Sequence, residues 1–247
     1  MIKHIALLTA ASLALASCNS ASSNSSTPTT PVAAVAAPAG TDWVSTVSAT
    51  PDGGYLMGNP NAAVKLLEFG ALSCPHCGHF AKESHDELHA MIASGKLSYE
   101  LRTYLIHPQI DLPASLLVSC NGPTTFFPMV DQMFAHQDDW AGAEKFKLLT
   151  PEVQKSWANM TPNQLAADVA DKLGLVGFVG ARGVSADKAK ACLADKAGID
   201  KLQTILSVAN DKYHITGTPT FILNGAIVPD TNDWAALKPK VKAAMGG

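Results

Sequence analysis

The sequence predicts an α/β fold that is interrupted by a long helical insertion. Three observations support this prediction. Residues 64–106 follow the order strand, helix, strand; residues 113–213 carry helical signals only; and residues 220–245 return to two short strands and a helix. The two ends of the folded region therefore form one α/β core, and the helical block is inserted between them.

The first predicted strand is the apolar run 64–69. A helix is expected from Cys74, because apolar residues then recur on one side and Pro75 suits a first helical turn; Gly95 follows as a stop. Residues 97–106 alternate between apolar and polar and predict a second strand. This order is typical of a parallel crossover unit.

The inserted block contains several predicted helices. Thr161 is a good N-cap, and Pro162 suits the first helical position. After the block, Asn224-Gly225 lies between two short apolar runs and is a strong hairpin-turn signal. Residues 234–245 predict a closing helix. The helices expected within the block cover residues 126–136, 161–174, 185–192 and 199–213.

The composition is that of an ordinary globular protein. The 247 residues are 47% hydrophobic and 16% charged, which is enough apolar material for a buried core. Lys and Arg number 18 against 21 Asp and Glu, so neither sign of charge dominates. Proteins that bind nucleic acids usually have a strongly positive surface, so nucleic-acid binding is not expected.

Residues 1–17 have the character of a secretory signal peptide. Lys3 precedes an apolar run that is too short to span a membrane, so we expect export to a compartment that permits disulfides. The segment 15–18, Leu-Ala-Ser-Cys, resembles the bacterial lipoprotein box, in which the cysteine becomes a lipid anchor. The alternative is ordinary cleavage after residues 14–16, Ala-Leu-Ala, which leaves Cys18 as a spare thiol.

Residues 18–40 are expected to form a disordered tether. Beyond the cysteine they are almost wholly Ser, Thr, Pro, Ala, Asn and Val, with no charged or aromatic residue to offset the entropy of ordering. As a flexible chain this segment would span about 25 Å. It would hold the folded part, which begins near Trp43, close to a membrane.

The motif Cys74-Pro75-His76-Cys77 has the spacing of a redox dithiol. At a helix start, free backbone N–H groups and the helix dipole favour the thiolate of Cys74, and Cys77 lies close enough to displace a mixed disulfide. Pro75 removes an N–H that has no helical partner, and a protonated His76 adds positive charge beside the sulfur. A stable thiolate favours a disulfide that oxidises other thiols.

A metal site is the alternative interpretation of these residues. His79 lies near the motif, but zinc requires four ligands and the remaining cysteines are distant in sequence. His85 and His89 have the i, i+4 spacing of a metal pair, although a pair without a third ligand is usually a solvated helix face. We therefore predict no metal and no cofactor.

Three features occur together here: the Cys-Pro-His-Cys motif, the helical insertion, and Thr218-Pro219 before a strand and hairpin. In these features the folded part of the chain resembles the thioredoxin superfamily and, within it, the periplasmic disulfide-bond protein A group of bacterial oxidases. The resemblance implies a thioredoxin fold with an inserted helical domain. Residues 41–112 and 214–247 would form the thioredoxin fold, and residues 113–213 the insertion.

The resemblance also implies roles for residues outside the motif. Pro219 would be cis and pack against the redox pair, and Thr218 would offer backbone contacts to a substrate peptide. Glu68 resembles the buried acid that relays protons to the resolving Cys77 in this family; a buried carboxylate needs such a task or a partner. A solvated Glu68 at a strand edge is the alternative.

A subset of the family has a second, non-catalytic disulfide in the insertion, which implies a bond between Cys120 and Cys192; two buried free thiols are the alternative.

Two residues depart from the family pattern. Thr218 stands where well-known oxidases have Val and isomerases have Thr. Asn19 after Cys18 is not the Asp that retains lipoproteins in the inner membrane, so either membrane could hold the anchor.

The resemblance thus implies a monomeric, membrane-tethered periplasmic oxidase. Its Cys74–Cys77 disulfide would pass to unfolded or partly folded exported proteins with free thiols, and a quinone-linked membrane partner would reoxidise it. A reductase or isomerase is the first alternative. A non-catalytic lipoprotein that binds a metal or a peptide on the same fold is the second.

Overall fold

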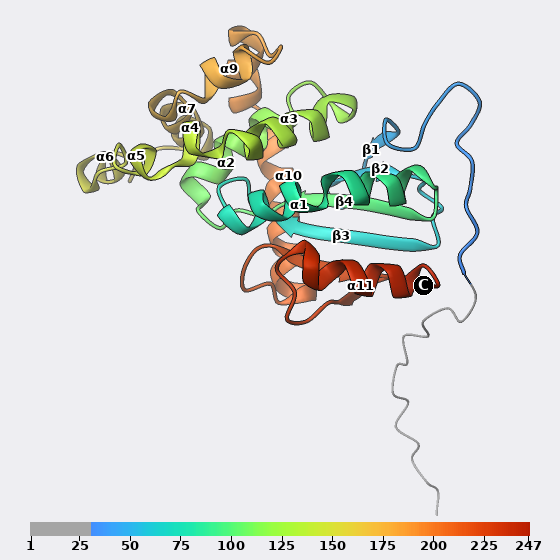
Figure 1. Cartoon of the computed structure of the whole chain (residues 1–247). Coiled ribbons are helices and arrows are strands. Elements are labelled where there is room, and N and C mark those ends of the chain that lie inside the picture. The colour runs from blue at the N-terminus through green and yellow to red at the C-terminus, as the bar shows by residue number, and fades with distance from the viewer. Residues whose placement is uncertain (1–30) are drawn as a thin grey trace, which may run out of the picture.

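The computed structural model describes residues 31–247. The predicted signal peptide, Cys18 and the first part of the predicted tether lie outside the described residues. The described part forms a six-stranded sheet with helices packed around it (Figure 1). No helix in this part of the chain has the length and apolar character needed to cross a membrane.

The sheet has the strand order β1-β2-β4-β3-β5-β6. At its centre β3 and β4 run parallel, joined by helix α1, and the other strands pair antiparallel. Six of the seven residues of β3 are buried, which explains its apolar run in the sequence. The strands are β1 Val47–Ala49, β2 Tyr55–Gly58, β3 Val64–Gly70, β4 Leu97–Thr103, β5 Thr220–Leu223 and β6 Ala226–Ile227.

Helices α1 (Pro75–Ala93) and α11 (Trp234–Ala244) pack against the sheet and against each other. The ring of Phe80 lies 4.6 Å from that of Phe221 and 6.2 Å from that of Trp234, measured between centroids. These aromatic contacts join α1, β5 and α11 into one core. They fix the start of α1 relative to the sheet.

The insertion between β4 and β5 is helical. Its α7 begins with a capping box in which Thr161 and Gln164 cap each other's backbone, as the Thr161 N-cap predicts. The helices are α2 Pro108–Val118, α3 Pro123–Ala135, α4 Gln137–Ala141, α5 Ala143–Phe146, α6 Pro151–Ser156, α7 Pro162–Leu173, α8 Leu175–Gly180, α9 Ala186–Leu193 and α10 Lys196–Ser207, followed by a π-helical turn, η1, Val208–Lys212.

The predicted α/β class with a thioredoxin fold is confirmed, but several local features differ. The β1–β2 hairpin was not predicted, and α2 begins at Pro108, before the predicted start of the insertion at residue 113. Residues 31–40, predicted as tether, lie along the folded part. The Val35 N–H donates to the Ser94 carbonyl at 2.9 Å, and the Trp43 indole donates to the Val35 carbonyl at 2.7 Å.

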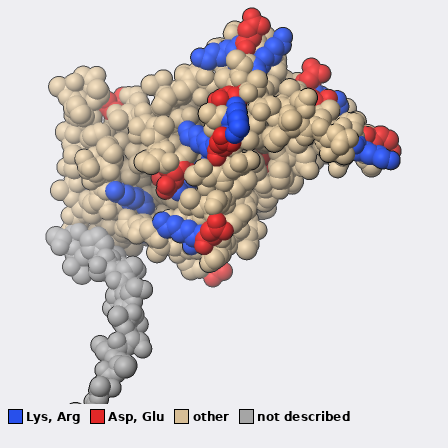
Figure 2. All heavy atoms as spheres, turned by 180° about the vertical axis from the view of Figure 1, so that it is seen from behind, with Lys and Arg blue, Asp and Glu red and all other residues tan. Residues whose placement is uncertain are grey.

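Charged side chains of both signs are visible on one face of the molecule (Figure 2). On the face that Figure 2 shows, blue and red groups lie interspersed on a mostly uncharged background. This distribution agrees with the near balance of acidic and basic residues in the sequence. It offers no strong field of one sign.

Candidate active site

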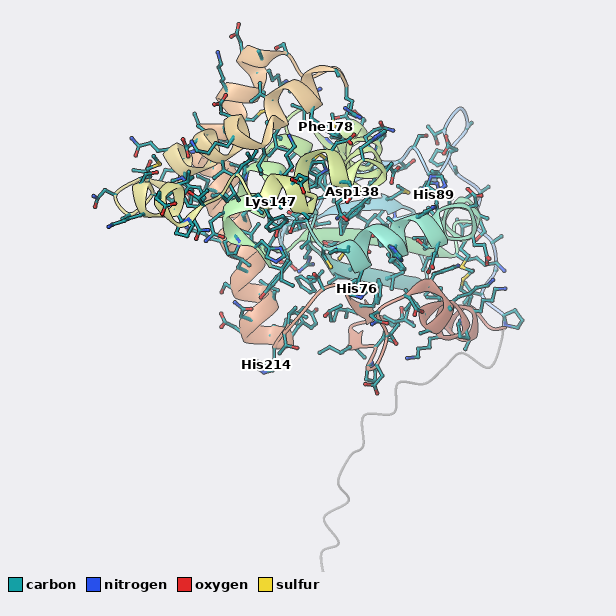
Figure 3. All side chains as sticks on the ribbon, turned by 60° about the vertical axis from the view of Figure 1, so that its left-hand side comes forward. His76, His89, Asp138, Lys147, Phe178 and His214 are labelled. Carbon is teal, nitrogen blue, oxygen red and sulfur yellow. A yellow bond between two sulfur atoms is a disulfide. The ribbon has the colours of Figure 1, made fainter. Side chains whose placement is uncertain are left out.

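Cys74 and Cys77 lie where β3 passes into α1. Cys74 is the N-cap of α1, with an extended backbone, and Cys77 lies in the first turn. Both are free thiols in the structure. Cys74 retains 4% exposure and Cys77 is fully buried, whereas Pro75 and His76 are exposed at the start of the helix (Figure 3). The geometry thus presents an outer and an inner sulfur.

The surroundings lower the pKa of Cys74 to about 5. The largest cause is the hydrogen bond from the Cys77 thiol; Thr218 and the backbone N–H groups of Cys77 and His76 add to it and outweigh the opposing effect of burial. These groups lie at a helix N-terminus, where negative charge is favoured. Cys74 is therefore a thiolate at neutral pH.

The same surroundings have the opposite effect on Cys77. Burial raises the pKa of its thiol well above the ordinary value, and its hydrogen bond to Cys74 and the negative charge of Glu68 raise it further. Cys77 therefore keeps its proton while Cys74 loses one. The two sulfurs of one motif differ in protonation.

Glu68 lies on β3 with 1% exposure. The Tyr99 hydroxyl donates to its Oε2 at 2.5 Å, and its Oε1 has no hydrogen-bond partner among the described residues. Burial raises the pKa of this carboxyl to about 8, against the lowering effect of the Tyr99 hydrogen bond. The alternative of a solvated Glu68 at a strand edge does not fit this position.

Thr218 and Pro219 lie directly beside the outer sulfur. The peptide bond between them is cis. In the protonated form, the Cys74 thiol donates to the Thr218 carbonyl at 3.3 Å. The loop before β5 thereby contacts the start of α1, although 144 residues separate the two in sequence.

Two residues that no sequence pattern marks, Asp111 and Gln137, hold the loop before Cys74. Asp111 accepts hydrogen bonds from the Ser73 backbone at 2.9 Å, the Ser73 hydroxyl at 3.1 Å and the His107 backbone at 2.8 Å. Burial raises the pKa of Asp111 to about 6. The Gln137 side chain donates to the carbonyls of Leu72 and Cys74 at 2.7 and 3.0 Å.

A groove of about 1310 Å³ opens beside the motif. It lies between α1 and the helices α3 to α5 of the insertion. Pro75, His79, His107, Gln137 and Phe146 are among the residues that line it. The groove leaves room for another chain next to the start of α1.

The other two described cysteines form a disulfide. Cys120, after α2, is bonded to Cys192 in α9, with 5.7 Å between their Cα atoms. The alternative of two buried free thiols does not fit this arrangement. Neither residue lines the groove beside Cys74.

The candidate metal ligands do not gather into a full set. The rings of His85 and His89 lie 4.2 Å apart, and His85 also pairs with Asp86 at 2.9 Å. Within residues 31–247 no three His, Cys, Asp or Glu side chains come together as metal ligands.

Known proteins are similar to this chain in fold and in sequence. A family model described as Thioredoxin matches residues 50–243. A crystal structure of a protein-disulfide isomerase from Novosphingobium aromaticivorans is 31% identical, with a TM-score of 0.74, over 79% of this chain and 99% of that one. The structure of α-DsbA1 from Wolbachia pipientis is 21% identical, with a TM-score of 0.60, over 77% and 90% of the two chains.

A Rickettsia conorii protein named as a protein-disulfide oxidoreductase is 27% identical over 181 residues. The match covers 70% of this chain and 54% of that protein, so the chain spans about half the length of such relatives.

The fold and the paired thiols at the start of α1 define a thioredoxin-fold protein with a Cys-Pro-His-Cys dithiol. The chain belongs to the thioredoxin family. Its resemblance to thiol-disulfide oxidoreductases is confirmed by the named relative and by the isomerase structure, and the α-DsbA1 structure shares its fold.

Proposed function

We propose that this protein is a thiol-disulfide oxidoreductase that donates the disulfide of Cys74 and Cys77 to other proteins. The proposal rests on the opposite pKa shifts of the two thiols. The pKa of Cys74 falls to about 5, whereas the pKa of Cys77 rises well above its ordinary value. A low pKa makes Cys74 a good leaving group and stabilises the reduced protein, so the disulfide is a strong oxidant. This favours an oxidase over a reductase.

The reaction begins with the oxidised protein. A substrate thiolate attacks Cys74 Sγ, the bond to Cys77 breaks, and Cys77 leaves as a thiolate and takes up a proton. A second substrate thiolate then attacks the substrate sulfur of the mixed disulfide and releases Cys74 as a thiolate. Two electrons pass from the substrate dithiol to the protein, and no cofactor or metal takes part.

Glu68 is the proposed proton relay for Cys77. Its charge acts on the Cys77 thiol, and its pKa of about 8 lets it give and take a proton near neutral pH. The Thr218 carbonyl and Pro219 are the proposed substrate contacts, since they lie beside Cys74. The groove next to Pro75 would hold the rest of the substrate chain.

The proposed substrates are unfolded or partly folded exported proteins with free thiols. The signal-peptide character of residues 1–17 and the DsbA-like relatives support a periplasmic location. We further propose a lipid anchor at Cys18, a monomeric state and a quinone-linked membrane reoxidant. Isomerisation is the second candidate activity, because isomerases also have Thr at the position of Thr218.

Trapping of mixed disulfides tests the proposal. A Cys77→Ser variant, charged at Cys74 with a small disulfide reagent, should accumulate protein bonded to a reduced one-cysteine substrate, because neither Cys77 nor a second substrate thiol can then attack the mixed disulfide. A Cys74→Ser variant should trap none, and an oxidised Cys120→Ser/Cys192→Ser variant should still oxidise the corresponding two-cysteine substrate. Equal trapping by the Cys74 and Cys77 variants would contradict the assigned order.

A further inference from the structure

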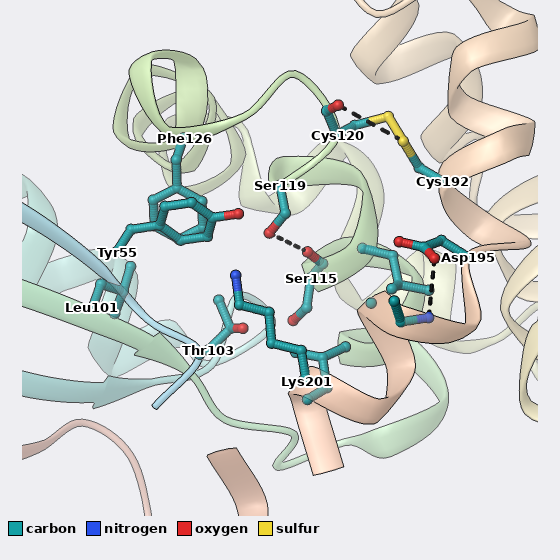
Figure 4. Close-up of a pocket in the computed structure, with 15 residues that line it drawn as sticks. Tyr55, Leu101, Thr103, Ser115, Ser119, Cys120, Phe126, Cys192, Asp195 and Lys201 are labelled. Carbon is teal, nitrogen blue, oxygen red and sulfur yellow. Dashed lines mark hydrogen bonds between the residues drawn. A yellow bond between two sulfur atoms is a disulfide. The ribbon is translucent and has the colours of Figure 1, made fainter. Parts of the chain in front are cut away.

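A second cavity, of about 270 Å³, lies between the sheet and the helical insertion (Figure 4). Residues of β2, β4, α2, α3 and α10 line it, and the Cys120–Cys192 disulfide forms part of its wall. It shares no lining residue with the groove beside Cys74. No step of the proposed redox chemistry uses this cavity.

Ser115, on α2, is the unusual residue of this cavity. It is 1% exposed, and its hydroxyl has no hydrogen-bond partner among the described residues. Its backbone carbonyl, in contrast, accepts from the Ser119 hydroxyl at 3.0 Å. Burial of an unpaired hydroxyl costs free energy. An unpaired hydroxyl on a cavity wall therefore indicates that a hydrogen-bonding group occupies the cavity.

Lys201, on α10, supplies a positive charge to the same space. Its amino group lies 4.5 Å from the centroid of the Tyr55 ring, and within residues 31–247 no carboxylate lies within ion-pair distance of it. Gly53 makes room for the lysine stem: its φ is +95°, and a Cβ there would lie 3.1 Å from Lys201 Cγ. The lysine is thereby directed along the cavity.

The rest of the lining suits an anion. The N-terminus of α10, a helix of 12 residues, forms one wall at Ala197 and Gly198, and helix N-termini favour negative charge. Asp195, the acid on this wall, is engaged as the N-cap and accepts from the Ala197 N–H at 3.0 Å. Tyr55 and Thr103 bring two further hydroxyl groups to the lining.

We propose that this cavity binds a small oxyanion, either a carboxylate or a phosphate group. Lys201 neutralises its charge, and the Ser115 hydroxyl donates a hydrogen bond to it. Drug-sized ligands occupy pockets of roughly 300 Å³ and above, so the cavity suits a small molecule. The site acts independently of the thiols, and its test does not rely on their activity.

Calorimetric titration of the oxidised full-length chain tests the proposal, with inorganic phosphate and succinate as separate probes and ionic strength held with chloride. Lys201→Gln and Ser115→Ala should each weaken binding by about tenfold, since each removes a charge-assisted contact. Lys190→Gln, an exposed lysine of α9, should leave binding unchanged.

The thermal melt separates misfolding from lost binding. Ser115→Ala removes a hydroxyl that has no partner, so the unliganded variant should melt no lower than the wild type. Tighter binding of phosphate or of succinate identifies the group the site takes. Binding of neither probe, or equal binding by the wild type and Lys201→Gln, would overturn the proposal.

Discussion

Cys74 and Cys77 meet within one helical turn at the start of α1, whereas Cys120 and Cys192 join the turn after α2 to helix α9 across a separation of 72 residues. The first pair is reduced and the second is bonded. The reduced pair is nevertheless the more deeply buried, since Cys120 and Cys192 are only half-buried. Exposure alone therefore does not separate a reactive pair from a structural one.

The difference lies in what surrounds each sulfur. Cys74 has the N-terminus of α1, the Cys77 thiol and Thr218 to stabilise a thiolate, whereas burial and the charge of Glu68 raise the pKa of Cys77. The surroundings of the first pair thus favour exchange, while the second pair closes a long loop.

The largest effect on stability should follow removal of the second pair. Closing a loop of this length stabilises a fold by about 4 kcal/mol in the chain-entropy model, so Cys120→Ala/Cys192→Ala should lose an amount of that order. Denaturant unfolding at pH 7 measures it. The rate of Cys74 alkylation should stay unchanged; a slower rate would show that the two pairs are coupled.

Glu68→Gln should give an effect of comparable size that depends on pH. A carboxyl whose folded pKa is raised, here from 4.5 to about 8, stabilises the fold at low pH and loses that contribution as the pH rises through 8. As the pH rises from 4.5 to 8, the unfolding free energy of the variant should increase relative to that of the wild type by a few kcal/mol, on the order of 1.4 kcal/mol per pKa unit. Exchange by Cys77 should slow by about 100-fold.

The exposed Glu83 of α1 provides the matched control. Glu83→Gln should follow the wild-type profile of unfolding free energy against pH. If Glu68→Gln and the wild type also gave parallel profiles, the assignment of Glu68 as a buried, protonated acid would be wrong.

Asp111→Asn should have a smaller effect. The Asp111 carboxylate accepts three hydrogen bonds from Ser73 and His107, and an amide turns one of its two oxygens into a donor. We expect a loss of about 2 kcal/mol in unfolding free energy. Asp139→Asn, on the exposed side of α4, is the control. A loss as small as that of the control would contradict the bracing role of Asp111.

Local patterns were enough to predict the centre of the fold. The apolar run of β3, the start of α1 at the motif and the Asn224-Gly225 turn are all encoded within a few residues. The β1–β2 hairpin was missed because β1 is a three-residue strand of which two residues are exposed, so it carries little apolar signal. Its pairing with β2 depends on the rest of the sheet.

Within the site, the sequence predicted the residues of the Cys-Pro-His-Cys motif but not the residues that hold the loop before the motif from elsewhere in the chain. Asp111 and Gln137 reach the motif loop from 38 and 63 residues away, and neither stands in a pattern that marks it. The hydrogen bond to Glu68 comes from Tyr99 of the neighbouring strand, because the pairing of β3 with β4 brings the hydroxyl to the carboxyl. Contacts of this kind follow from the tertiary fold and not from local sequence.

The thermal melts of the oxidised and reduced forms test the central claim most directly. In the Cys120→Ala/Cys192→Ala background, Cys74 and Cys77 can be reduced without a second disulfide opening. The pKa of Cys74 is lowered from 9.0 to about 5, so its thiolate stabilises the reduced fold at pH 7, and this contribution is lost as the pH falls through 5.

The reduced form should therefore melt above the oxidised form at pH 7, and the gap should shrink toward pH 5. An oxidised form that melts higher at pH 7 would contradict the account, because the Cys74–Cys77 disulfide would then not be a strong oxidant.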